Sequence, residues 1–207
     1  MDNIKNIILD LGGVLINLDY DKLNKSLSSL GLSNAFSKAK QIELFDKLEE
    51  GKISDKNFLR EFNELAKANH NHQAIINAWN SILLDFPQER LRLLRLLAKK
   101  YRMFLFSNTN SIHINEVYNI LKRDCGVNDL NQYFERIYLS NEFGLRKPKP
   151  EGFKLILEDN QLNANETLFI DDSPQHIEGA KKVGLNAKWL DLEKEDITIL
   201  INRLSLI

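Results

Sequence analysis

The sequence predicts an α/β protein with a mainly parallel sheet, flanked by helices and interrupted by an inserted block of helices. Three observations support this prediction. Short apolar runs alternate with segments of helical periodicity along most of the chain, which is the order that βαβ units produce. Residues 19–86 contain helical spacing and no convincing alternating strand. Acidic or polar residues follow directly after several apolar runs, where open α/β sheets bind ligands.

Five apolar runs are predicted to be strands of the sheet. The first is Ile7, Ile8 and Leu9, which Asp10 ends, and two flexible glycines follow. The other predicted strands are Met103–Phe106, Ile137–Leu139, Thr167–Ile170 and Ala187–Leu190. Helical segments separate them, and two of these helices are predicted to begin near Pro87 and Pro174, because proline suits the first helical turn.

The helical block divides the chain into two predicted units. Apolar residues at helical spacing indicate four helices in residues 19–86, with stops at Gly31 and Gly51 and a helix N-cap at Ser54. We therefore predict a helical cap subdomain over 19–86, inserted into a core domain formed by 1–18 and 87–207. Glu49 and Glu50 are expected at a solvated helix end, although the cap loop beside Gly51 could instead face substrate. Arg146 is expected to be solvated or to contact a neighbouring residue rather than substrate.

Composition narrows the classes of function. The chain has 207 residues, of which 43% are hydrophobic and 28% charged, and its formal net charge is −1. These values are typical of a globular protein and give no reason to expect nucleic-acid or membrane partners. A single cysteine, Cys125, cannot form an internal disulfide. The chain start does not resemble a signal peptide, and no apolar window is long enough to span a membrane. We expect a cytoplasmic monomer.

Polar residues are placed directly after three of the predicted strands, and a lysine lies in the loop after another. They are Asp10 after the first strand, Ser107-Asn108 after the second, and Asp171-Asp172 after the fourth, and Lys147 lies in the loop that follows the third. Parallel strands bring these positions to one edge of the sheet. Three carboxylates there repel one another, and a divalent cation or a lysine would relieve the repulsion.

This set of residues matches the needs of in-line phosphoryl transfer. Mg²⁺ takes oxygen ligands, commonly one or two carboxylates together with a substrate phosphate. Lys147 would add a positive charge, and Ser107 and Asn108 would add hydrogen-bond donors for the phosphate. A carboxylate can serve as the nucleophile. The alternative interpretation of three solvated loop acids does not explain their shared placement.

Four motifs in this order resemble the haloacid dehalogenase superfamily, in its phosphatase branch with a helical cap after the first motif. The motifs, which span most of the chain, are Asp10-Leu-Gly-Gly-Val14, Phe106-Ser-Asn-Thr-Asn110, Gly144-Leu-Arg-Lys-Pro148 and Phe169-Ile-Asp-Asp-Ser173. Further runs resemble the bacterial subgroup that contains an α-D-glucose-1-phosphate phosphatase; they are Glu50–Asp55, Ser107–His113 and Ile137–Ser140. The resemblance implies a Rossmann-like core and a Mg²⁺-dependent phosphatase of a small phosphorylated metabolite, such as a hexose 1-phosphate.

The resemblance also implies roles for the residues of the site. Asp10 would be the nucleophile, forming an aspartyl-phosphate, and also a metal ligand. The backbone carbonyl of Gly12 and the carboxylate of Asp172 would be further metal ligands, with Asp171 beside them as a ligand or as an orienting residue.

The phosphate would have its own set of binding residues. Ser107 and Asn108 would bind the transferring phosphate, with Gly12 beside it. Lys147 would pair with both the phosphate and Asp10.

The sequence departs from the family pattern at two positions. Phosphatases of this superfamily usually carry a second Asp two residues after the nucleophile, as the general acid and base, and this sequence has Gly12 there. General acid–base catalysis commonly contributes about 10²–10⁴-fold. A better leaving group, a water molecule or His113 could compensate. His176 stands where relatives often have Asp or Asn, which would loosen the outer shell of the metal.

Two alternative functions remain open at this point. A 2-haloacid dehalogenase would also use Asp10 as the nucleophile, but that chemistry needs no metal and usually has Tyr in place of Gly12. A non-catalytic binding module could have kept the fold and lost turnover with the second Asp. Magnesium-dependent phosphate release would separate the phosphatase from both alternatives.

Overall fold

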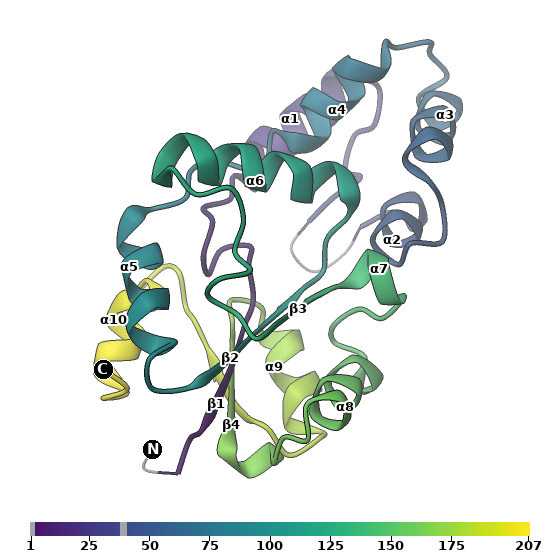
Figure 1. The fold of residues 1–207 in the computed structure, drawn as a ribbon. Coiled ribbons are helices and arrows are strands. Elements are labelled where there is room, and N and C mark those ends of the chain that lie inside the picture. The colour runs from purple at the N-terminus through teal and green to yellow at the C-terminus, as the bar shows by residue number, and fades with distance from the viewer. Residues whose placement is uncertain (1–2, 38–40) are drawn as a thin grey trace.

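A five-stranded parallel sheet forms the centre of the computed structural model, which describes residues 3–37 and 41–207 (Figure 1). The strand order is β3-β2-β1-β4-β5, so β1 lies in the middle of the sheet. The strands are β1 (Asn6–Leu9), β2 (Arg102–Ser107), β3 (Arg136–Leu139), β4 (Thr167–Asp171) and β5 (Asn186–Trp189). This confirms the predicted fold class.

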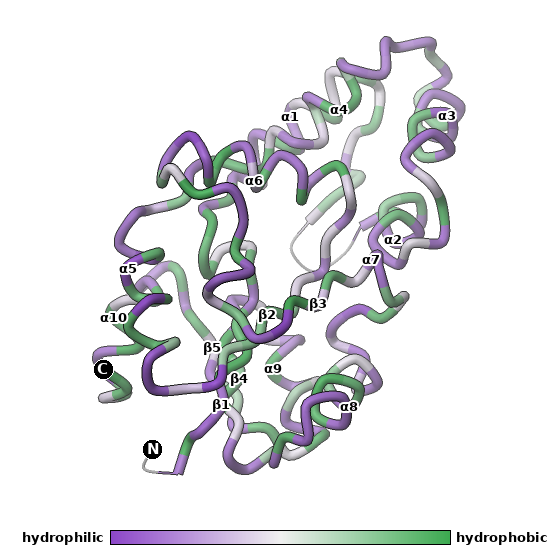
Figure 2. Tube along the Cα trace, in the orientation of Figure 1, coloured by the Kyte–Doolittle hydropathy of each residue, from purple (hydrophilic) through white to green (hydrophobic). Residues whose placement is uncertain are grey.

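The central strands are apolar on both faces because helices cover both faces of the sheet. Ile7 and Leu9 of β1 face one layer of helices, whereas Ile8 faces the other. The first layer contains α5 (Gln88–Leu97), α6 (Ser111–Cys125) and α10 (Ile197–Arg203), and the second contains α8 (Pro150–Asp159) and α9 (Pro174–Lys181). Figure 2 shows the apolar strands between helices that alternate between apolar and polar residues.

Among the residues that the structure describes between β1 and β2, four helices are inserted. They are α1 (Tyr20–Ser29), α2 (Glu43–Glu49), α3 (Asp55–Ala66) and α4 (His72–Asn80). Ser54 caps α3 as predicted, and its side chain accepts a hydrogen bond from the N–H of Asn57. The insertion has its own apolar cluster around Trp79, whose ring packs 4.3 Å from that of Phe45 and 5.9 Å from that of Phe58, measured between centroids.

The chain leaves and re-enters the core through two segments that run side by side. The Asn17 N–H donates to the Asp85 carbonyl at 2.9 Å, and the Leu84 N–H donates to the Asn17 carbonyl at 3.0 Å. The Asp19 N–H then bonds the Ile82 carbonyl at 2.8 Å. These bonds join the two connections into a short antiparallel pair, so the insertion is attached to the core at one edge.

Some element boundaries differ from the sequence predictions. β5 runs one residue earlier than predicted, because it is an edge strand with mostly exposed residues and its pairing with β4 sets its position. α6 ends at Cys125, where Gly126 adopts a left-handed conformation. Two short helices were not predicted, namely α7 (Ser140–Phe143) and the 3₁₀ helix η1 (Ala164–Glu166). Within 3–37 and 41–207, every helix is too short or too polar to cross a membrane.

Candidate active site

The carboxyl ends of β1, β2 and β4 bring the predicted acidic and polar residues to one edge of the sheet. Asp10 follows β1, and its N–H donates to the Ile170 carbonyl of β4 at 3.0 Å. Ser107 is the last residue of β2, and Asp171 is the last residue of β4. The parallel register pairs Leu9 with both neighbouring strands, and the next residue, Asp10, therefore lies level with these strand ends.

Lys147 lies between two of the carboxylates and is buried. Its Nζ is 2.7 Å from Asp10 Oδ1 and 2.7 Å from Asp171 Oδ2. The same ammonium donates to the carbonyl of Phe106 at 2.8 Å, which uses its third hydrogen. Lys147 therefore holds the ends of β1, β2 and β4 together through one buried charge.

The pKa values of the two carboxyl groups beside Lys147, those of Asp10 and Asp171, are shifted in opposite directions. Burial and the charge of Asp171 raise the pKa of the Asp10 carboxyl to about 8, and Lys147 opposes this rise. Burial also disfavours the charge on Asp171, but Lys147 and His176 outweigh it and hold the pKa of Asp171 below its usual range. Burial would lower the pKa of Lys147, but Asp10 and Asp171 outweigh burial and raise it, so the lysine is charged.

Asp171 is oriented by a set of hydrogen bonds. The Ser173 N–H donates to its Oδ1 at 2.8 Å, and His176 Nδ1 lies 3.0 Å from both carboxylate oxygens. His176 therefore orients Asp171 directly. Because His176 departs from the family pattern, we expected a looser outer shell around the metal. In the part of the chain that the structure describes, Asp10, Asp171 and His176 form a group whose ligand atoms lie within 4.8 Å of one another.

Asp172 approaches the glycine loop after β1. A Cβ on Gly13 would lie 2.5 Å from Asp172 Oδ2, so only glycine leaves room for this carboxylate, and Gly13 also has a positive φ of 73°. The Asp172 carbonyl accepts a hydrogen bond from Trp189 Nε1 at 3.0 Å, which fixes its main chain. Asp10, Asp171 and Asp172 together carry more negative charge than Lys147 balances, so the donor set fits a divalent cation.

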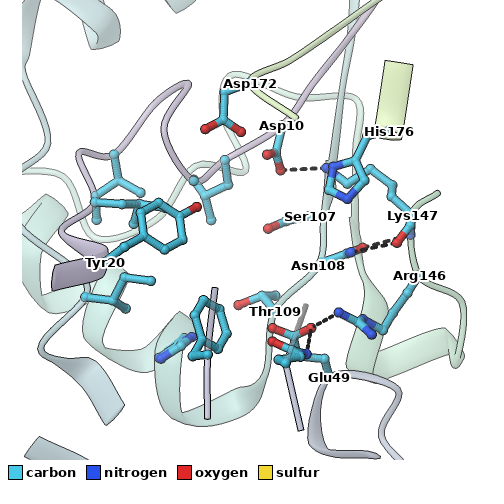
Figure 3. A pocket seen from close by; sticks show the side chains of 18 of the residues that line it. Asp10, Tyr20, Glu49, Ser107, Asn108, Thr109, Arg146, Lys147, Asp172 and His176 are labelled. Carbon is cyan, nitrogen blue, oxygen red and sulfur yellow. Dashed lines mark hydrogen bonds and ion pairs between the residues drawn. The ribbon is translucent and has the colours of Figure 1, made fainter. Parts of the chain in front are cut away.

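Ser107 and Asn108 are placed differently from each other. Ser107 is buried and lines the cavity beside Asp10 (Figure 3). The Asn108 side chain accepts from the Lys147 N–H and donates to the Lys147 carbonyl, both at 2.9 Å. Asn108 therefore fixes the main chain of the lysine, a contact that was not predicted from the sequence, and one hydrogen on its Nδ2 remains for a ligand.

These residues form one end of a cavity of about 420 Å³ between the core and the insertion. At its other end, Arg146 of the core loop lies 2.6 Å from Glu49 of α2, and it also pairs with Asp46 (Figure 3). Gln41 Nε2 donates to Asp46 and Glu49 at 3.0 and 2.9 Å. Ionic contacts between the insertion and the core therefore border this end of the cavity.

The expectation that Glu49 is solvated was wrong. Glu49 is buried and 6% exposed, because its helix end packs against the loop that carries Arg146. Burial raises the pKa of its carboxyl, and Arg146 opposes the rise. Gly51 follows this helix end, and it was the residue in the sequence that could have indicated close packing here. A Cβ on Gly51 would lie 2.1 Å from the Asn141 carbonyl oxygen, so only glycine fits. Arg146 contacts neighbouring residues, as expected.

His113 is not available as a replacement acid. Its Nε2 lies 3.1 Å from the Trp79 carbonyl, and its Nδ1 lies 3.2 Å from Asn110 Nδ2. The two contacts define a neutral ring that donates through Nε2 and accepts through Nδ1. Burial lowers its pKa to about 4. His113 therefore joins the insertion to α6 and has no proton to give to a substrate.

Comparison with known proteins agrees with this fold. Residues 7–189 match the family model described as haloacid dehalogenase-like hydrolase. The D-ribitol-5-phosphate phosphatase of Bacteroides thetaiotaomicron is 31% identical over 209 residues, which cover 96% of this chain and 99% of that protein.

Two solved structures are similar over almost the whole chain. One is a HAD family enzyme from Bacteroides thetaiotaomicron, solved as the wild-type protein in complex with magnesium and inorganic phosphate. It has a TM-score of 0.84 and 36% identity, over 95% of this chain and 98% of that one. The other is a predicted HAD-like family hydrolase from Porphyromonas gingivalis, with a TM-score of 0.88, 28% identity and 98% coverage of both chains. The chain belongs to the haloacid dehalogenase-like hydrolase family.

Proposed function

We propose that this protein is a Mg²⁺-dependent phosphatase of a small polyol or sugar phosphate, such as ribitol 5-phosphate. The observation that carries the proposal is the buried ammonium of Lys147 between Asp10 and Asp171, at the floor of a cavity lined by Ser107 and Asn108. A full-length relative named for ribitol 5-phosphate and a solved relative with magnesium and phosphate support it.

In this proposal, Asp10 is the nucleophile. One of its carboxylate oxygens attacks phosphorus and forms an aspartyl-phosphate, which water then hydrolyses. Lys147 contacts Oδ1 of the same carboxylate, so it orients the attacking group and offsets negative charge as the phosphoryl oxygens approach. Ser107 and the remaining hydrogen of Asn108 donate to those oxygens, and Gly12 lies beside them on the cavity wall.

Asp10, the backbone carbonyl of Gly12 and Asp172 would hold the Mg²⁺ in this proposal. Asp171 stands beside them and is committed to Lys147, Ser173 and His176, so its role is to hold the lysine rather than to bind the ion. Bound Mg²⁺ supplies positive charge that keeps Asp10 ionised and neutralises the phosphoryl oxygens. The close approach of Asp172 to Gly13 supports its place among the ligands.

The charges at the far end of the cavity favour a substrate whose non-reacting part is uncharged and carries hydroxyl groups. Glu49 and Asp46 outnumber Arg146 there, and Arg146 is already paired with both. A second phosphate or a carboxylate on the substrate would meet net negative charge, whereas hydroxyl groups could both donate and accept. The volume of about 420 Å³ lies in the range of small-molecule sites. We propose that residues 19–86 act as a cap that excludes water over this cavity.

A hexose 1-phosphate is a second candidate substrate. Its anomeric oxygen is a better leaving group than that of an alkyl phosphate, which would lessen the effect of having Gly12 in place of an acid. The same neutral hydroxylated tail would fit the cavity end near Glu49.

Phosphate release from a substrate panel tests the proposal. The panel holds ribitol 5-phosphate, a hexose 1-phosphate, a hexose bisphosphate and a phosphorylated carboxylic acid, each with Mg²⁺ and with EDTA. We expect Mg²⁺-dependent release from the first two and much weaker release from the doubly anionic compounds. Asp10→Asn should abolish release, whereas Asp129→Asn, which changes a half-buried loop acid outside the cavity, should not.

Two results would contradict the proposal. The absence of release from every substrate, in protein that binds Mg²⁺ and phosphate, would favour a binding module. Halide release from a 2-haloacid without metal would favour a dehalogenase.

A further inference from the structure

Tyr20 lies where the chain passes from the core into the helical insertion. It is the first residue of α1, and its side chain lines the same cavity as Asp10 and Ser107. Figure 3 shows its hydroxyl pointing into the cavity, toward Asp10 and Ser107. The ring stacks on Phe36, with centroids 6.1 Å apart and an interplanar angle of 23°. The phenol is therefore held by its ring and projects its oxygen at the reacting end of the site.

The hydroxyl of Tyr20 makes no hydrogen bond to any residue in the described ranges 3–37 and 41–207. Burial, followed by the carboxylates of Asp172 and Asp10, raises its pKa above the usual range. A phenol has an ordinary pKa of about 10, so the hydroxyl carries its proton at neutral pH, and a bound substrate would meet a neutral donor rather than a phenolate. A phenol hydroxyl can donate one hydrogen bond to an oxygen in the cavity.

The position where the family usually has its second Asp is Gly12 in this chain and carries no side chain. A Cβ added there would lie 2.9 Å from Leu18 Cδ1, so the Leu18 side chain packs closely against the glycine. His113 is committed to Trp79 and Asn110. Gly12 therefore offers no acid for the leaving group, and His113 has no proton to give. Tyr20 approaches the reacting end from the insertion side.

We propose that Tyr20 is a catalytic residue, whose hydroxyl donates a hydrogen bond to the ester oxygen of the substrate. This inference rests on the proposed phosphatase function. As an Asp10 carboxylate oxygen bonds to phosphorus, the bond between phosphorus and the ester oxygen breaks, and its electron pair stays on that oxygen. The hydrogen bond from Tyr20 stabilises this charge until the oxygen takes a proton from water. A second water then attacks the aspartyl-phosphate and releases inorganic phosphate and Asp10.

The dependence on the leaving group tests this assignment. Wild type and Tyr20→Phe are compared on ribitol 5-phosphate, whose alkoxide is a poor leaving group, and on 4-nitrophenyl phosphate, whose nitrophenolate needs no donor. We expect kcat for ribitol 5-phosphate to fall roughly 100-fold, the low end for the loss of one transition-state donor. KM should change little, because the charge develops only in the transition state. Turnover of 4-nitrophenyl phosphate should stay within about three-fold.

Tyr118→Phe is the matched control, because Tyr118 lies on α6, is half-buried and packs against the core rather than the cavity. It should leave both substrates within about three-fold. Equal losses on both substrates with Tyr20→Phe would overturn the proposal, because they would show that the hydroxyl only shapes the cavity. Unchanged kcat on both would overturn it too. If the wild type hydrolysed neither substrate, the proposed phosphatase function itself would fail, which is a distinct result.

Discussion

Arg146 and Glu49 form an ion pair between the core and the helical insertion, with Arg146 Nη2 2.6 Å from Glu49 Oε2. The side chain of Arg146 is 19% exposed and that of Glu49 is 8% exposed, so the pair is largely removed from water. Arg146 directly precedes Lys147 in the chain. The position of the insertion is therefore connected to the loop that carries the buried lysine of the site.

Arg146→Met should destabilise the protein, because it leaves Glu49 buried without its counter-charge. The expected loss at pH 7 is about 3 kcal/mol in the free energy of unfolding, as for the removal of one partner from a buried ion pair. Burial raises the pKa of Glu49 even with Arg146 present, so the loss should shrink in acid as Glu49 becomes protonated. Urea unfolding at pH 7 and at a lower pH measures both effects.

Lys149→Met is the control for that variant. Lys149 pairs with Glu50 at 2.6 Å between the same two units, but its side chain is 56% exposed and Glu50 keeps Lys52 as a partner. Its removal should cost less than about 1 kcal/mol. If the two variants were equally stable, the pair between Arg146 and Glu49 would not be the main charge contact between insertion and core.

Gly13→Ala should weaken Mg²⁺ binding. The new Cβ would displace the Asp172 carboxylate, which lies within 2.5 Å of that position. Gly126→Ala is a matched control, because Gly126 also has a positive φ, of 68°, but no atom lies within 4 Å of its Cβ position. Both variants should lose about 1 kcal/mol from backbone strain. Only Gly13→Ala should raise the Mg²⁺ concentration that gives half-maximal phosphate release, and an equal rise in both would count against Asp172 as a ligand.

Lys147→Arg should lower kcat by more than about 100-fold, although the charge is kept. The Lys147 side chain is fully buried and directs its three donors at Asp10, Asp171 and the Phe106 carbonyl. A planar guanidinium is larger and cannot reproduce this arrangement. Lys149→Arg, at an exposed lysine that pairs with Glu50, should keep wild-type turnover. Full activity of Lys147→Arg would show that charge alone suffices at this position.

His113 should make stability depend on pH. Its pKa is about 4 in the folded protein against 6.5 for an unperturbed histidine, so between these values the unfolded state binds a proton that the folded state does not. Stability should therefore fall as the pH decreases from about 7 to about 4, by roughly 3 kcal/mol from this residue.

His113→Gln should remove that part of the pH dependence, because glutamine can still donate to the Trp79 carbonyl and accept from Asn110 without titrating. Urea unfolding curves at pH 7 and pH 5 measure the difference. His72→Gln, at an exposed position, is the control and should keep the wild-type slope. A wild-type slope in His113→Gln would contradict the assignment.

The arrangement of the sheet and the position of the site were predictable because they depend on local signals. Apolar runs such as Ile7–Leu9 are buried on both faces and are therefore recognisable as central strands. Parallel strands share one carboxyl edge, so the residues that follow them meet without further information. Asp10, Ser107 and Asp171 could be brought together on this ground alone.

The pairing within the site was not predictable in the same way. Asp171 and Asp172 are adjacent in sequence, but one faces Lys147 and the other faces the Gly13 loop. Which side chain turns which way depends on the conformation of the chain after β4 and on partners such as His176. The sequence pattern identifies these carboxylates as site residues, but it does not determine which way each side chain points.

The amino-acid sequence by itself determined the α/β core, the helical insertion and the set of polar residues at the strand ends, because periodicity and chain order encode them. Only the tertiary structure decided the environments of Glu49, His113 and Tyr20. Each was placed by the packing of the insertion on the core, which buried Glu49 against Arg146, committed His113 to Trp79, and turned the Tyr20 hydroxyl into the cavity. Contacts between distant segments depend on how two folded units fit together, and no local pattern records that fit.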